Sequence, residues 1–96
     1  MKAMDLEGYW ETTDEKYSLQ FRFSEELDAG GIMIASGKGI PEEELSFDLL
    51  ISKDGFQLHT KNKKSGNVNM TAIKPKGLNI EVTIGSQKLI FVRQVR

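Results

Sequence analysis

The feature that most constrains this chain is an alternation of apolar and polar residues with a period of two, which recurs along its whole length. Eight short segments show the alternation, and residues spaced in this way lie on one face of a β-strand. Short runs rich in glycine, aspartate, serine or proline separate the segments. The residues expected on the buried face are Leu6, Gly8, Trp10 and Thr12; Tyr17, Leu19, Phe21 and Phe23; Ile32 and Ile34; Leu45, Phe47, Leu49 and Ile51; Phe56 and Leu58; Val68, Met70 and Ala72; Leu78, Ile80, Val82 and Ile84; and Leu89, Phe91, Arg93 and Val95.

The short connections between these segments favour one arrangement of the strands. They are too short for crossover helices, so the strands should run antiparallel in sequence order. Closing the sheet would remove two unprotected edges. We therefore predict an all-β fold, an eight-stranded antiparallel up-and-down meander barrel, in a single domain over residues 1–96. The alternatives are an open or partly flattened sheet that pairs its edges in a dimer and, locally, a helical turn at residues 25–29.

The turns also predict the registers of neighbouring strands, because the length of a hairpin loop determines which residues face each other. Each expected register places the apolar residues of both strands on one face of the sheet. The turns and pairs are Asp14-Glu15 with Trp10 opposite Leu19, Asp54-Gly55 with Ile51 opposite Leu58, Pro75-Lys76-Gly77 with Met70 opposite Val82, and Gly85-Ser86 with Val82 opposite Leu89.

The amino-acid composition excludes several kinds of site and segment. The chain contains no cysteine, which excludes disulfides, thiolate zinc sites and a cysteine nucleophile. No apolar run has the length of a signal peptide or approaches the ~20 residues of a membrane-spanning helix. We expect a cytoplasmic protein with no membrane partner.

A second sequence pattern consists of residues on the first and the last expected strands. Gly8-Tyr9-Trp10 lies on the first expected strand and Arg93 on the last. Trp10 and Arg93 should face inward on strands that become neighbours on closure, where a guanidinium can stack on an indole. Gly-x-Trp at the start of an eight-stranded meander, with an arginine at its end, resembles the calycin group of lipocalins, fatty-acid-binding proteins and avidins. The chain looks most like the minimal lipocalin-like barrels of bacteria. The resemblance implies that Gly8, Trp10 and Arg93 close one end of the barrel, with Arg96 as the alternative arginine.

The expected interior is almost wholly apolar. An eight-stranded barrel is just wide enough to be filled by side chains or to hold one small ligand. Both outcomes stay open, because five phenylalanines and one tryptophan on short strands can fill the lumen. Tyr17 and Arg93 would be the polar groups of a pocket. The residues expected to line it are Tyr17, Phe21, Phe23, Ile34, Phe47, Met70, Phe91 and Arg93.

Residues that could carry catalysis are scarce. His59, the only histidine, is expected to point outward opposite Leu50, without a carboxylate or serine partner. Glu42-Glu43-Glu44 is better interpreted as a solvated loop, since adjacent carboxylates diverge along a strand. Ser36-Gly37-Lys38-Gly39 lacks the earlier glycine and the final serine or threonine of a phosphate loop. We expect no enzyme, no catalytic residue, no metal site and no cofactor.

Charge is divided unevenly between the two halves of the chain. Residues 1–48 carry four basic and twelve acidic residues, whereas residues 49–96 carry nine basic and two acidic residues. In a meander these halves form opposite sides, so the basic side could attract an acidic protein or a second copy of the chain. Nucleic acid is disfavoured as a partner, because the basic half has no outward aromatic side chain on which bases could stack.

An apolar patch is expected on the outside of the barrel. Tyr9, Ile90 and Val92 should face outward on the first and last strands, where they could form a homodimer or partner interface. The sequence as a whole favours a non-catalytic binding protein for a small apolar or amphipathic ligand in the lumen. The alternative is a filled barrel that acts as a protein-interaction or inhibitor module through its charged sides and this patch.

Overall fold

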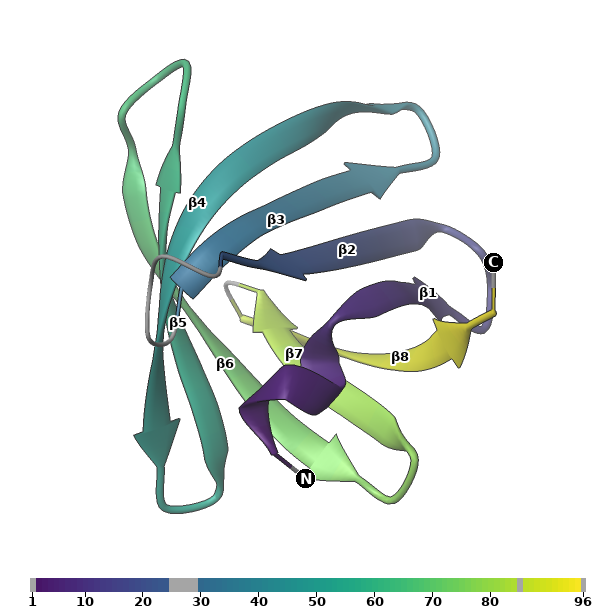
Figure 1. The fold of residues 1–96 in the computed structure, drawn as a ribbon. Helices are drawn as coiled ribbons and strands as arrows, with labels where there is room; N and C mark the ends of the chain where they lie inside the picture. The colour runs from purple at the N-terminus through teal and green to yellow at the C-terminus, as the bar shows by residue number, and fades with distance from the viewer. Residues whose placement is uncertain (1, 25–29, 85, 96) are drawn as a thin grey trace.

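Eight antiparallel strands follow one another around a closed barrel in the computed structural model, and the last strand pairs with the first (Figure 1). The structure describes residues 2–24, 30–84 and 86–95, so the helical turn expected at 25–29 lies outside the described residues. The all-β meander barrel is confirmed, and the open sheet is wrong. The elements are the 3-10 turn η1 (Ala3–Leu6), β1 (Gly8–Thr12), β2 (Tyr17–Phe23), β3 (Gly30–Gly37), β4 (Ile40–Ser52), β5 (Gly55–Asn62), β6 (Val68–Lys76), β7 (Asn79–Ile84) and β8 (Gln87–Gln94).

The antiparallel order gives the barrel two different ends. At one end lie η1, the start of β1, the end of β8 and the turns β4–β5 and β6–β7, and we call this the closed end. At the other, the open end, lie the connections β1–β2, β3–β4, β5–β6 and β7–β8. The two ends differ in how completely side chains fill the interior.

Aromatic side chains form the core toward the closed end. Trp10, Phe21, Phe47 and Phe91 are almost completely buried. The Phe21 and Phe47 rings meet edge to face with their centroids 6.0 Å apart, and Phe23 meets Phe47 in the same way at 5.4 Å. Edge-to-face pairs add to the stability that burial of their area provides. This half of the barrel is therefore packed with side chains.

Two of the expected registers are confirmed. Trp10 lies opposite Leu19 between β1 and β2, and Val82 lies opposite Leu89 between β7 and β8. In both hairpins the apolar and polar residues of the strands alternate clearly, and the turn expected from the sequence predicts the same register as this alternation.

The inward face of β3 differs from the expectation. Met33, not Ile32 or Ile34, faces the interior, and its side chain is 6% exposed. Ile32-Met33-Ile34 is a continuous apolar run, so the alternation does not distinguish its two faces. Gly31, which lies opposite Phe23, has no room for a side chain, because a Cβ atom built there would collide with the backbone of Arg22 and Phe23.

The inward face of β6 is also reversed. Ile73 is buried opposite Val82, whereas Val68 and Met70 are mostly exposed. The predicted pairing of Met70 with Val82 is therefore wrong. The physical reason is a shorter turn, in which Lys76 faces Asn79 across Gly77 and Leu78. Gly77 has a φ of +66°, which suits the first position of a two-residue hairpin turn.

The turn between β4 and β5 is displaced by one position. It contains Lys53 and Asp54 in place of Asp54 and Gly55, so Ile51 faces Phe56 and not Leu58. The register shifts by two residues, which keeps the apolar faces of both strands toward the interior. Ile51 itself extends past the core and is 82% exposed.

Candidate functional site

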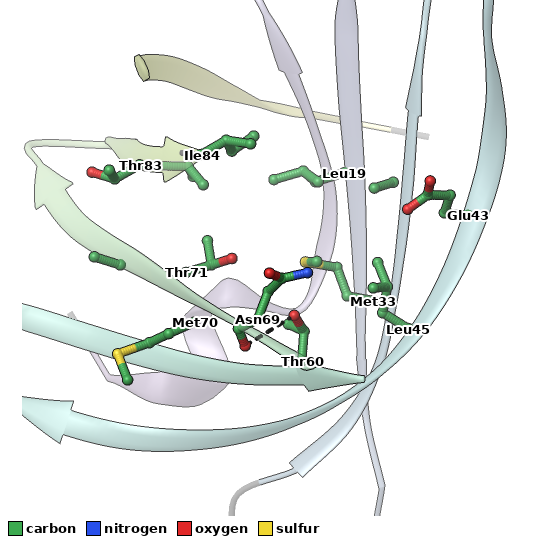
Figure 2. Close-up of a pocket in the computed structure, with 13 residues that line it drawn as sticks. Leu19, Met33, Glu43, Leu45, Thr60, Asn69, Met70, Thr71, Thr83 and Ile84 are labelled. Atoms are coloured by element: carbon green, nitrogen blue, oxygen red, sulfur yellow. Dashed lines mark hydrogen bonds between the residues drawn. The ribbon is translucent and has the colours of Figure 1, made fainter. Parts of the chain in front are cut away.

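A cavity of about 470 Å³ lies in the open half of the barrel (Figure 2). Most of its wall is apolar, and its polar side chains come mainly from β5 and β6. The lining residues are Leu19, Met33, Ala35, Glu43, Leu45, Thr60, Asn69, Met70, Thr71, Ala72, Val82, Thr83 and Ile84.

Small side chains explain why the interior is hollow at this end. Ala35 lies opposite Leu19 on the inner face, at a level where no aromatic residue lines the cavity. Across the barrel, β6 contributes Asn69 and Thr71 to the inner face. Aliphatic and short polar side chains leave the space that rings occupy toward the closed end, so a cavity remains between these strands.

The cavity reaches solvent where β6 and β7 separate. Their described pairing begins with Ala72 opposite Thr83, so residues 68–71 of β6 extend beyond it. Ile84, at the end of β7, is 45% exposed although it belongs to the inward-facing set of that strand. A ligand could therefore enter at this edge of the open end.

A short polar strip runs along the wall formed by β5 and β6. Thr60 is 2% exposed, and its hydroxyl donates a hydrogen bond to the backbone carbonyl of Asn69 at 3.3 Å. Figure 2 shows the carboxamide of Asn69 and the hydroxyl of Thr71 projecting into the cavity from β6. Glu43 lies across the cavity on β4, opposite Ala35 of β3. The polar groups thus lie on two sides of the cavity, on β5 and β6 and on β4, and apolar side chains form most of the remaining lining.

Most of the residues that the sequence predicts as ligand contacts lie elsewhere. Phe21, Phe47 and Phe91 belong to the packed core, and Tyr17 and Phe23 pack against it. None of these aromatic side chains lines the cavity, because their rings pack in or against the core. They support the cavity from the closed-end side but do not line it.

The two remaining apolar predictions have different outcomes. Ile34 lies on the outer face of β3, beside Ser18 and Ser36, as a consequence of the reversed strand. Met70 does border the cavity, but its side chain is 60% exposed and points away from the interior in Figure 2. The sequence expectation missed Asn69 and Thr71, because the alternation of apolar residues placed Val68 and Met70 on the inward face of β6.

Arg93 and Trp10 pair at the closed end and not at the cavity. They lie opposite each other in the β1–β8 register, with the guanidinium carbon 4.3 Å from the centre of the indole ring. The indole nitrogen of Trp10 donates to the carbonyl of Leu6 at 2.8 Å, so its one polar group is satisfied. Arg93 donates from Nη1 to the carbonyl of Glu7 at 2.8 Å and from Nη2 to that of Asp5. Arg93 thereby ties η1 to the strands that close the barrel.

Gly8 has a structural role beside this pair. Its φ is +123°, a conformation that side chains strongly disfavour. A Cβ atom built there would lie 3.0 Å from Nη1 of Arg93. The glycine before Trp10 therefore permits both the backbone turn from η1 into β1 and the approach of the guanidinium.

The expected exterior patch is only partly exposed. Ile90 is 40% exposed, while Tyr9 and Val92 are half-buried on the neighbouring strands. Tyr9 pairs with Gln94 and Val92 with Glu11, so Tyr9 and Val92 are diagonal neighbours on β1 and β8. The role of this patch as an interface stays a prediction.

The β1–β2 turn at the open end is held by its own side chains. The hydroxyl of Thr12 donates to Oδ1 of Asp14 at 2.6 Å, and the backbone amide of Lys16 donates to the same oxygen at 3.1 Å. The hydrogen bond from Thr12, followed by that from Lys16, lowers the pKa of Asp14 below its ordinary value. This network orders the turn and does not extend to the cavity lining.

His59 faces Asp48 across β4 and β5, not Leu50, because the register between these strands is shifted. Within the described ranges, no three His, Asp or Glu side chains are grouped so that they could hold a metal ion. The described part of the chain also contains no helix long and apolar enough to cross a membrane. Comparison of the sequence with protein-family models, with curated proteins and with solved structures finds no match.

Proposed function

We propose that this protein is a non-catalytic binding protein that holds a small apolar or amphipathic molecule in the cavity at the open end of its barrel. The observation that carries the proposal is the cavity itself, about 470 Å³ in volume and lined largely by aliphatic side chains. Binding sites for small molecules typically have volumes of about 300–1,000 Å³, an apolar lining and a few convergent polar groups.

The division of the barrel into a packed half and a hollow half supports this proposal. Trp10, Phe21 and Phe91 are each at most 1% exposed and belong to the packed core. Aliphatic side chains above them create a preformed apolar surface, so little ordering of the protein is required when a ligand binds. The filled-barrel alternative lacks such an observation in its favour.

A relationship to lipocalin-like barrels is part of the same proposal. It is supported by the meander order, by the stacking of Arg93 on Trp10 and by the positive φ of Gly8. These features concern how the barrel closes, so they support a shared architecture. The chemistry of the ligand must be argued from the cavity.

Titration with N-phenyl-1-naphthylamine, a neutral fluorophore whose emission rises in apolar surroundings, tests the proposal. We expect saturable binding with one site per chain and a micromolar Kd. Binding should disappear in denaturant together with the far-ultraviolet circular dichroism of the barrel. A linear, non-saturating signal with the folded protein would contradict the proposal, because a preformed apolar cavity should bind this probe.

A further inference from the structure

The polar groups that line the cavity differ in what they can offer a ligand. Asn69 and Thr71 carry both donors and acceptors, so they can serve almost any polar head group. Thr60 already donates its hydroxyl proton to the carbonyl of Asn69, which leaves only acceptor sites on its oxygen. None of these three residues selects the charge of a ligand.

Glu43 does carry a charge. It lies opposite Ala35 in the β3–β4 pairing, on the side of β4 that faces the barrel interior, and it lines the cavity. Figure 2 places it at one edge of the cavity, across from the strip that contains Asn69 and Thr60. A carboxylate accepts hydrogen bonds and attracts cations.

No lysine or arginine lines the cavity within the described residues. Lys61 lies opposite Ser46 on the outward-facing side of β5, and Nζ of Lys63 lies 3.5 Å from Oε1 of Glu44. A carboxylate head group bound beside Glu43, which is itself exposed to solvent, would therefore meet a like charge with no cation in the lining to offset it.

We propose that the cavity selects amphiphiles whose head group is a cationic hydrogen-bond donor, such as a primary alkylammonium, over those with a carboxylate head. The apolar chain would pack against Leu19, Met33 and Leu45, and the ammonium group would lie between Glu43 and the acceptors on β6. This proposal rests on the proposed function, since it assigns the ligand class of the same cavity.

Competition for the bound fluorophore tests the selection. Decylamine, decanol and decanoate, used below the concentrations at which they form micelles, should displace N-phenyl-1-naphthylamine from the wild-type protein in that order of affinity. We expect decylamine to bind about tenfold more tightly than decanoate, because one interaction with Glu43 is attractive and the other repulsive. Equal or tighter binding of decanoate would overturn the proposal.

Two matched substitutions assign the effect to one carboxylate. Glu43→Gln should bring the affinities of decylamine and decanoate to within about twofold of each other. Glu42→Gln makes the same change of charge at the neighbouring position, outside the cavity lining, and should leave the preference intact. An unchanged preference in Glu43→Gln would overturn the assignment. Absence of fluorophore binding to the wild-type protein would instead contradict the proposed function.

Discussion

Replacement of Trp10 by alanine is expected to lower the free energy of unfolding by about 3–5 kcal/mol, the usual cost of truncating a large buried aromatic side chain. The indole is 1% exposed and stacks against Arg93. Its removal leaves a cavity at the closed end and takes away the donor to the carbonyl of Leu6. Arg93 would lose the surface on which its guanidinium lies, so the connection between η1, β1 and β8 should weaken.

Urea unfolding followed by circular dichroism measures this effect, since the only tryptophan is the residue removed. Leu78→Ala is the matched control at the same end of the barrel. Leu78 is 90% exposed, so its replacement should change the free energy of unfolding by no more than about 0.5 kcal/mol. A loss below about 1 kcal/mol in Trp10→Ala would show that the indole does not close the barrel.

Replacement of Ala35 by phenylalanine is expected to weaken binding of N-phenyl-1-naphthylamine at least tenfold. Ala35 lines the cavity between Leu19 of β2 and Glu43 of β4. A ring at this position would occupy the space assigned to the ligand. Because the neighbouring space is empty, the ring should be accommodated at a cost in stability no larger than the about 1–3 kcal/mol typical of overpacking.

Ile34→Phe provides the matched control for this substitution. Ile34 is the preceding residue on the same strand and lies on the outer face. The same ring introduced there should leave the affinity for the fluorophore within about twofold of wild type, since strand neighbours point to opposite faces. Thermal unfolding verifies that both variants fold. Undiminished binding to a folded Ala35→Phe protein would place the fluorophore outside the cavity.

The fold is predictable from the sequence because the turn residues and the alternation of apolar residues indicate the same arrangement of strands. Between β1 and β2 the turn at Asp14-Glu15 and the alternation of apolar residues indicate the same register, and the structure has that register. The pairing of Trp10 with Arg93 follows from chain closure, which the number and order of strands imply. These inferences need only local turn geometry and a period of two.

The candidate site was not predictable by the same reasoning. On β6 the exposed Val68 and Met70 alternate as a buried face would, while the residues that do face inward include Asn69 and Thr71. In this part of β6 the polar side chains face the cavity and the apolar ones face outward, the opposite of what is usual for a strand beside a core. The alternation therefore assigned the wrong face to the strand that supplies most of the polar strip.

Turn length is the second reason that the site was missed. Dipeptides such as Asp54-Gly55 favour a tight turn, but the structure places its turns at Lys53-Asp54 and at Gly77-Leu78. In the β4–β5 pair the strand register is displaced by two residues, which preserves the inward face of both strands. In the β6–β7 pair the register is displaced by an odd number of residues, which reverses the inward face of β6. As a result Ile73 lies in the core and Met70 is mostly exposed, the reverse of the predicted placement.

The most direct test of the central claim is a titration with N-phenyl-1-naphthylamine followed through carbon-13-labelled methionine methyl groups. Met33 faces the barrel interior and lines the cavity, whereas Met4 lies at the closed end and is 60% exposed. If the probe binds in the cavity, the Met33 methyl signal should shift and saturate with the fluorescence, and the Met4 signal should stay in place. A shift of Met4 alone, or an unchanged Met33 signal at saturation, would contradict a binding cavity at the open end.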